Sequence, residues 1–210
     1  MALVTISRHF GAGGHTLGDM TCEKFGFHLV DASVITALAK ESKLNPNWLT
    51  AMEKEASSTV LSLISKVASR GLFYKTPGVP VTEKAERLKY INFLTKIFTA
   101  MADEGGYVII GRGAQFILKK HPKVIHVLLV ADYESRINFL VDKHRISRSE
   151  AEKAIRAREK ERTSMASRLF EADIDDACYY HLVLNTGRMP YEWARETLFQ
   201  LVSRLLEKEV

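Results

Sequence analysis

The sequence predicts a doubly wound α/β fold on a five-stranded parallel sheet, and three observations favour it. The apolar runs are continuous rather than alternating, which is typical of strands covered on both faces. Helical patterns separate these runs, as they do in βαβ units. A glycine-rich loop directly follows the first run, and ligands in such folds bind at the carboxyl ends of strands. A chain of 210 residues is long enough for one such domain with a full core.

The expected elements follow the apolar pattern along the chain. Strands are expected at residues 3–6, 27–30, 107–110, 124–130 and 181–185. Helices are expected at residues 16–25, 59–69, 83–103, 134–144 and 191–208. Turn residues at 74–80 interrupt the long interval between the second and third strands.

Two intervals between strands are longer than a single crossover helix requires. The first, about residues 35–104, is expected to be a helical insertion on the substrate side of the sheet. The second, about residues 145–170, is expected to be a helical excursion after the fourth strand. The chain is therefore expected to form one domain, residues 1–210, with two excursions from its sheet.

Composition and charge exclude several classes of protein. No apolar run is long enough to cross a membrane, and the first residues lack the pattern of a signal peptide. Cys22 and Cys178 are the two cysteines, and their spacing suggests neither a disulfide framework nor a zinc site. These features predict a cytoplasmic protein with no membrane partner. The net charge of +5 is compatible with nucleic acid or with a highly charged nucleotide as the ligand.

The segment from Arg8 to Thr16 is the candidate phosphate site. A glycine-rich turn between a strand and a helix lets successive backbone N–H groups converge on an anion. The P-loop pattern G-x-x-x-x-G-K-[ST] is met only in part, because Arg8 replaces the first glycine and Gly14 replaces the lysine. A tight strand–helix turn that needs two glycines at positive φ is the alternative interpretation.

Arg112 is a second candidate ligand for phosphate. It directly follows an apolar strand, between Gly111 and Gly113, and is expected at the same sheet edge as the glycine-rich loop. Its planar fork of donors suits a phosphate group. A surface arginine in a turn is the alternative interpretation.

Arg158 and Arg162 form a third candidate site. They lie four residues apart on an expected helix and so share one face. Glu159 and Glu161 are expected to point elsewhere and to leave both arginines without neutralising partners. Arginines on a mobile segment stabilise the charge of phosphoryl transfer and exclude water. A solvated helix with many ion pairs is the alternative interpretation.

Carboxylates follow two of the expected strands. Asp31 closes the second strand, where it is expected to reach a magnesium-bound water or a nucleotide hydroxyl. Asp132 follows the fourth strand and is expected to cap the helix that begins near Tyr133. The acidic run 173–176 is expected to be a solvated loop, and the seven histidines show no metal-ligand spacing.

Together these features resemble the cytidylate kinase-like branch of the nucleoside monophosphate kinases over nearly the whole chain. The opening Ser-Arg-x-x-Gly-x-Gly-Gly at residues 7–14 and the closing Leu-Asn-Thr-x-Arg at residues 184–188 are fairly specific to this branch when they occur together. Asp31, the Gly-Arg-Gly segment at 111–113 and the arginines between 158 and 168 add to the likeness.

The resemblance implies a P-loop NTPase core with a helical NMP-binding insertion and an arginine-bearing lid. It implies transfer of the ATP γ-phosphoryl group to CMP or dCMP, with Mg²⁺. Arg158 and Arg162 would act on the transferring group, and Thr16 would contact the magnesium ion. The acceptor would be bound by Asp31, Arg112 and Arg168. The donor phosphates would be bound by Arg8, Gly11, Ala12, Gly13, Gly14, His15 and Thr16.

The chain departs from the family pattern in two places. Gly14 stands where the classical enzymes have a lysine, and Arg8 or Arg162 is expected to replace that lysine. Residues 32–36 offer hydroxyl groups and no arginine for the acceptor phosphate. Two alternatives therefore stay open: a nucleotide sensor without turnover, and a P-loop kinase of another small acceptor.

A nucleic-acid-binding protein is a further hypothesis. Residues 142–168 hold nine Lys and Arg residues against five Asp and Glu residues. This stretch lacks interleaved aromatic residues before Phe170, so stacking on bases is poorly provided for. The sequence therefore favours small-molecule nucleotides as partners, and it does not indicate an oligomeric state.

Overall fold

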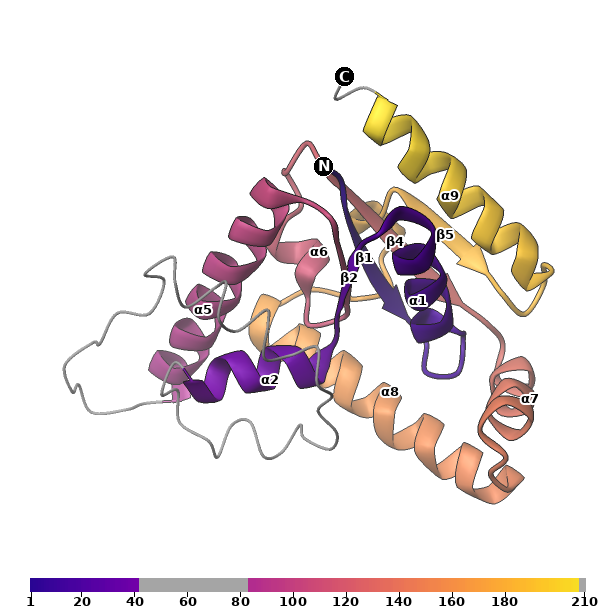
Figure 1. Cartoon of the computed structure of the whole chain (residues 1–210). Coiled ribbons are helices and arrows are strands. Elements are labelled where there is room, and N and C mark those ends of the chain that lie inside the picture. Colours follow the sequence, from indigo (N-terminus) through magenta and orange to yellow (C-terminus); the bar gives the residue numbers. More distant parts are fainter. Residues whose placement is uncertain (42–82, 208–210) are drawn as a thin grey trace.

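The structure is a computed structural model, and it describes residues 1–41 and 83–207 (Figure 1). The expected helix at 59–69 and the expected turn at 74–80 lie outside the described residues.

A parallel sheet lies at the centre of the molecule. Its strands are β1 (Leu3–Arg8), β2 (His28–Val30), β3 (Tyr107–Ile110), β4 (Val124–Val130) and β5 (Leu182–Asn185). They lie in the order β2-β3-β1-β4-β5, and every neighbouring pair is parallel. This order confirms the predicted doubly wound five-stranded sheet of a P-loop NTPase core.

The register of the sheet decides which residues emerge together at its carboxyl edge. Ile6 of β1 lies opposite Ile110 of β3 and Val127 of β4. Arg8 at the end of β1 therefore emerges beside the residues that follow Ile110. The connection after β1 leads to β2 on one side, whereas the connection after the neighbouring β3 leads to β4 on the other side. Doubly wound folds bind their ligands between two such strands.

Eight helical segments accompany these strands in the described ranges. They are α1 (Gly14–Phe25), α2 (Ala32–Glu41), α5 (Glu83–Glu104), α6 (Ala114–Ile117), α7 (Tyr133–His144), α8 (Arg148–Phe170), the 3-10 helix η1 (Ala177–Tyr179) and α9 (Tyr191–Glu207). The helices predicted at 83–103, 134–144 and 191–208 are confirmed to within a residue or so at each end. The first helix begins at Gly14, earlier than predicted.

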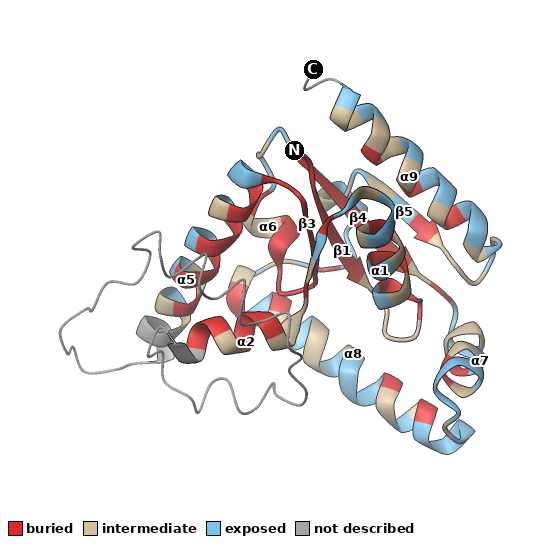
Figure 2. Ribbon diagram, in the orientation of Figure 1, coloured by how far each residue is buried: buried red, intermediate tan, exposed pale blue. Residues whose placement is uncertain are grey.

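Alternate residues of the central strands contribute their side chains to two separate hydrophobic cores (Figure 2). Leu3 and Ile109 point to one face, where α2 and α5 pack. Val4 and Ile110 point to the other face, where α1 and α9 pack. Burial on both faces explains why the strand sequences are continuous apolar runs.

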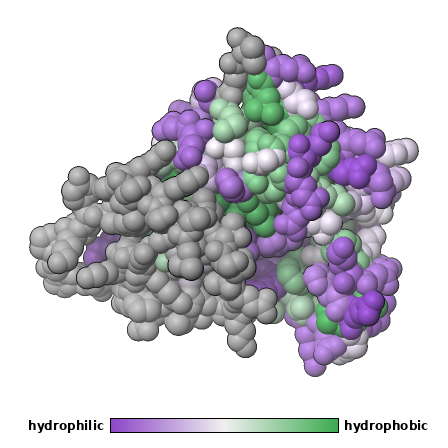
Figure 3. All heavy atoms as spheres, in the orientation of Figure 1, coloured by the Kyte–Doolittle hydropathy of each residue, from purple (hydrophilic) through white to green (hydrophobic). Residues whose placement is uncertain are grey.

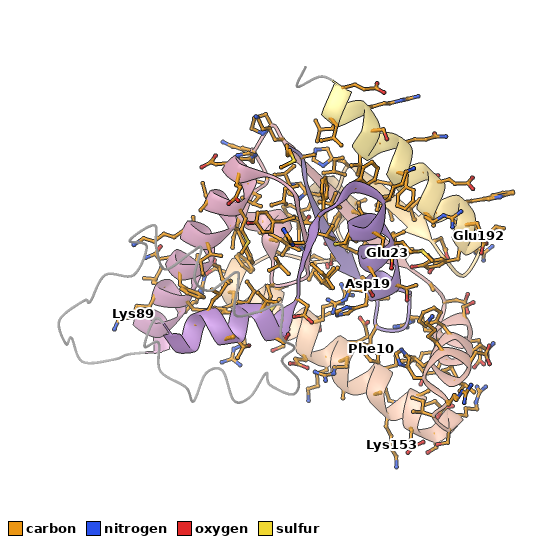
Figure 4. The ribbon with its side chains drawn as sticks, viewed as in Figure 1. Phe10, Asp19, Glu23, Lys89, Lys153 and Glu192 are labelled. Atoms are coloured by element: carbon orange, nitrogen blue, oxygen red, sulfur yellow. The ribbon has the colours of Figure 1, made fainter. Side chains whose placement is uncertain are left out.

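The helices α7 and α8 form a smaller third cluster around Ile137 and Ile155, and Phe10 from the β1–α1 loop packs against it (Figure 4). The N-terminus of α8 has a capping box between Ser147 and Glu150. Hydrophilic side chains cover much of the outer surface of this region (Figure 3). None of the described helices is both long enough and apolar enough to cross a membrane.

Candidate functional site at the carboxyl edge of the sheet

The glycine loop, residues 9–13, connects β1 to α1. Gly11 and Gly13 have φ angles of 90° and 82°, in the left-handed region that favours glycine. A Cβ on Gly11 would lie 2.9 Å from the carbonyl oxygen of Arg136, so the loop also needs glycine there for close packing. The N–H of Ala12 is used within the loop, where it donates to the His9 carbonyl at 3.0 Å.

Two residues after β5 hold the glycine loop from the other side. The Thr186 hydroxyl donates to the Ala12 carbonyl at 3.1 Å. The Tyr191 hydroxyl donates to the Gly13 carbonyl at 2.6 Å, and burial raises the pKa of Tyr191. These contacts fix the loop through its carbonyl oxygens. The first N–H groups of α1, which have no partner inside a helix, remain directed out of its N-terminus.

Arg8 runs through the centre of the site. A Cβ on Gly14 would lie 2.8 Å from Cγ of Arg8, and one on Gly111 would lie 2.7 Å from Nη1 of Arg8. The side chain therefore passes between the first residue of α1 and the first residue after β3. Glycine at both positions leaves the space that the Arg8 side chain fills.

The Arg8 guanidinium is surrounded by like charge. Burial, followed by the charges of Arg162, Arg112 and Arg158, lowers the pKa of Arg8 from 12.5 to about 10, and the charge of Glu159 opposes this shift. We call Arg8, Arg112, Arg158 and Arg162 the arginine cluster. It unites the three sequence segments that were predicted to bind phosphate.

The backbone at Arg112 is unusual. Gly111, Arg112 and Gly113 have φ angles of 74°, 57° and 68°, so three successive residues are left-handed. For a side chain as large as arginine this conformation costs about 1 kcal/mol or more. Arg112 is nevertheless buried, with 7% of its surface exposed, and it hydrogen-bonds the buried Tyr90 hydroxyl on α5. The alternative of a surface arginine in a turn is wrong.

Arg158 and Arg162 do not stand without partners, and the expectation that Glu159 and Glu161 point elsewhere is wrong. Arg158 pairs with Glu161 at 3.1 Å. Arg162 donates to Glu159 at 2.9 Å and to both oxygens of Asp175 at 2.9 Å. The cause is helical spacing, because residues three apart also lie side by side. Even so, the Arg162 side chain is only 9% exposed and lies against the site.

Glu159 joins α8 to the glycine loop. Its Oε1 accepts a hydrogen bond from the backbone N–H of Phe10 and lies 3.4 Å from Nη1 of Arg136. The Arg136 side chain on α7 is 12% exposed. Sequence reasoning missed both residues, since neither belongs to a motif, and only the packing of α7 and α8 on the loop reveals them.

The acidic run 173–176 is only partly a solvated loop. Asp175 binds Arg162 and lies 3.4 Å from Nε2 of His9, and hydrogen bonds from His9 and Arg162 lower its pKa despite burial. Asp176 caps η1. Asp175 therefore belongs to the site, through a contact with residues distant in sequence.

The two carboxylates that follow strands both cap helices. Asp132 accepts from the Ser135 N–H at 2.9 Å, which confirms it as the cap of α7. Asp31 accepts from the Ser33 and Val34 N–H groups, at the start of α2, through Oδ1. Its other oxygen lies 3.9 Å from Nε2 of His15. Asp31 thus reaches the start of α1 while it serves a structural role.

The remaining predicted residues lie at the margin of the site. His15 is exposed and Thr16 is half-buried, both in the first turn of α1. Arg168 is exposed in the last turn of α8. It is not among the described arginines whose charge lowers the pKa of Arg8. Phe170 and Tyr179 pack on Phe116, at 4.9 Å between ring centroids, and not on an open surface.

Comparison with known proteins decides the family. The model of the cytidylate kinase-like family matches residues 3–188, which include the glycine loop, the arginine cluster and Thr186. The chain belongs to the cytidylate kinase-like family. This membership confirms the resemblance that the sequence motifs indicated.

Two solved structures are similar to this cytidylate kinase-like protein, and the first of them supports its fold. An uncharacterized protein from Eubacterium ventriosum superposes with a TM-score of 0.67 at 16% identity, over 97% of this chain and 99% of that one. Shikimate kinase from Acinetobacter baumannii, in complex with shikimate, gives a TM-score of 0.49 at 15% identity, over 97% and 94% of the two chains. No curated protein matches the sequence.

The oxygen atoms at the site of the cytidylate kinase-like protein suit a magnesium ion that binds together with phosphates. No group of three or more His, Cys, Asp or Glu side chains that could hold a metal occurs in residues 1–41 and 83–207. Magnesium takes oxygen ligands, keeps several waters, and is often held by one or two protein groups plus substrate phosphates. The Thr16 hydroxyl and the Asp31 carboxylate are oxygen donors at the start of α1 and α2, and they fit this mode.

Proposed function

We propose that this chain is a kinase that transfers the γ-phosphoryl group of ATP to CMP, dCMP or a related small acceptor. The observation that carries the proposal is the arginine cluster, in which four cations from β1, the β3–α6 turn and α8 meet beside the glycine loop. Such a concentration of like charge is unfavourable by itself. It becomes favourable when polyphosphate lies among the guanidinium groups.

The backbone and its flanking residues would bind the donor. N–H groups at residues 11–16 would bind the donor phosphates at the N-terminus of α1, where the helix dipole also favours an anion. Ala12 is the exception, because its N–H is used inside the loop. Thr16 would hold magnesium, which when bound neutralises charge on the donor phosphates. His15 and Asp31 would lie beside that ion.

Arg112 would bind the acceptor phosphate, with Arg168 at the outer margin. The hydrogen bond between Arg112 and Tyr90 links this position to α5. Residues 35–104 would form the acceptor-side insertion, and 145–170 the lid. Arg158 and Arg162 would turn from their carboxylate partners toward the transferring group. Phosphoryl transfer needs mainly positioning and charge stabilisation, so no general base from the protein is required.

A nucleotide sensor without turnover is the second candidate, and one observation favours it. Position 14, where the P-loop pattern has lysine, is a glycine, and Arg162 is bound by two carboxylates. The sensor predicts ATP binding without phosphoryl transfer. A kinase of another small acceptor on the same core predicts turnover with none of the nucleoside monophosphates.

A coupled ADP-release assay with ATP and magnesium tests the proposal. CMP, dCMP, UMP, AMP and GMP are offered separately, against a control without acceptor. We expect turnover well above the control with CMP or dCMP. Measurable ATP binding with no turnover for any acceptor would contradict the proposal and favour the sensor.

A further inference from the structure

We propose that Arg8 replaces the missing P-loop lysine, and holds the donor phosphates from the end of β1 instead of from the start of α1. This inference rests on the proposed function, because it assigns the cation that contacts the donor. Of the two arginines that the sequence offers for this task, the packing favours Arg8 over Arg162.

The first argument is the position of Gly14. In the P-loop pattern this residue would be lysine, with its side chain rising from the first turn of the helix. Here a Cβ at this position would lie 2.8 Å from Cγ and 3.1 Å from Cβ of Arg8. The two side chains cannot both be large. The arginine therefore occupies the space beside the helix start that a lysine stem at position 14 would need.

The second argument is the route of the Arg8 side chain. Position 8 is a glycine in the P-loop pattern, and the end of β1 then carries no side chain. In this chain Nη1 of Arg8 passes so close to Gly111 that a Cβ there would lie 2.7 Å away. Glycine at both 14 and 111 clears a passage for one long cation. An arginine at position 8 and a lysine at position 14 are thus mutually exclusive in this packing, and we call their replacement of one another the coupled exchange.

The third argument is that Arg8 has no carboxylate partner among the described residues, while Arg162 has two. Within the described part of the chain, no carboxylate lies within ion-pair distance of Arg8. Arg162 is held by Glu159 and Asp175. Glu159 acts on Arg8 only as a weaker, longer-range charge. A half-buried guanidinium that lies near other arginines, and that has no carboxylate partner among the described residues, is positioned for an anionic ligand.

The variant R8M tests the inference, because methionine keeps the apolar stem and removes the charge. Binding of MgATP is measured by titration calorimetry for wild type, R8M and the control R204A, whose arginine lies in the last turn of α9. We expect ATP affinity to fall roughly ten- to a hundredfold in R8M, and to stay unchanged in R204A. R8M without ligand should melt at or above the wild-type temperature, since a half-buried cation that is repelled by other arginines is removed.

A purely structural role for Arg8 gives the opposite pattern. R8M would then melt lower than wild type while the protein that remains folded binds ATP with wild-type affinity, and this result would overturn the inference. Wild-type protein that binds no ATP would overturn both this inference and the proposed function. Wild type and R8M that bind ATP equally would overturn the inference alone.

The exchange itself supplies a second test. G14K alone places a lysine stem against Arg8 and should weaken ATP binding by roughly tenfold or more. R8G/G14K restores the ordinary P-loop arrangement and should bind ATP more tightly than either R8M or G14K. A double variant that binds no better than G14K would contradict the coupled exchange.

Discussion

The Glu159 carboxylate on α8 accepts a hydrogen bond from the backbone N–H of Phe10 in the glycine loop. Its other oxygen binds Arg162 at 2.9 Å. One side chain therefore connects the loop that would hold the donor to the arginine that would act on the transferring group. A change in the position of α8 must alter the surroundings of the loop, so the proposed lid would be coupled to the proposed donor site.

This connection predicts a local effect of E159A. Removal of the carboxylate leaves the Phe10 N–H without its acceptor, so its amide should exchange with solvent roughly tenfold faster. Hydrogen exchange read at Phe10 measures this. The control is E161A, which removes a neighbouring carboxylate that binds Arg158 and not the loop. Equal exchange at Phe10 in E159A and wild type would refute the coupling.

The position of Arg162 predicts that R162A loses phosphoryl transfer while it keeps nucleotide binding. We expect kcat to fall by about a hundredfold or more, because this charge would stabilise the transition state. The dissociation constant for ATP should change only a few-fold. Steady-state kinetics and calorimetry measure the two effects.

Two variants separate this catalytic effect from lost packing of α8. D175A removes one partner of Arg162 but keeps the guanidinium, so most of kcat should survive. R156A removes an exposed arginine from the same helix and should resemble wild type. A wild-type kcat in R162A would show that the lid assignment is wrong.

The Tyr191 hydroxyl predicts a contribution of α9 to the stability of the glycine loop. Y191F removes the hydrogen bond to the Gly13 carbonyl but keeps the ring beside Gly13. We expect the free energy of unfolding in urea to fall by about 1 kcal/mol. Y133F, which alters an exposed tyrosine on α7, should unfold like wild type. No difference between the two variants would argue against the role of Tyr191.

Buried His126 in β4 predicts a dependence of stability on pH. Burial, with the neighbouring His181, lowers the pKa of His126 to about 4. The Thr5 hydroxyl lies 2.8 Å from Nδ1, where it donates to the neutral ring. The unfolded chain binds a proton at this histidine below about pH 6.5, and the folded chain does not until about pH 4. Stability is therefore lost as the pH falls through this window.

The variant H126Q isolates this effect. Urea unfolding at several pH values between 7 and 4 should show wild type losing up to about 3 kcal/mol more than H126Q over the window. Parallel curves for the two proteins would mean that the pKa of His126 is the same in the folded and unfolded states, and would contradict the prediction. The site at the opposite end of the sheet is not involved in this prediction.

The strands and helices could be predicted because their burial is a property of consecutive residues. Strands β3 and β4 lie at the predicted residues, since both of their faces are covered and nearly every side chain in them is apolar, His126 being the exception in β4. The start of α1 was placed too late, because Gly14 is a weak helix former whose place in the helix is decided by its packing against Arg8.

The site could be predicted only in part. Arg8 was found because it belongs to the P-loop-like segment at the end of β1, and Arg112 because it stands two residues after β3. A parallel sheet brings such positions together. Asp175 and Arg136 were not found, because their contacts join segments far apart in the sequence. The ion pair between Glu159 and Arg162 was misjudged, because helical spacing allowed it but did not require it.

The most direct test of the proposed phosphoryl transfer follows both reaction products by phosphorus NMR. Wild-type protein is incubated with ATP, magnesium and CMP, and then with dCMP, beside a sample without acceptor. We predict that a nucleoside diphosphate forms from the acceptor in equal amount to the ADP released, and that neither forms quickly without acceptor. ATP that stays intact with both acceptors, or that yields only ADP and inorganic phosphate, would contradict the assignment of this chain as a cytidylate-type kinase.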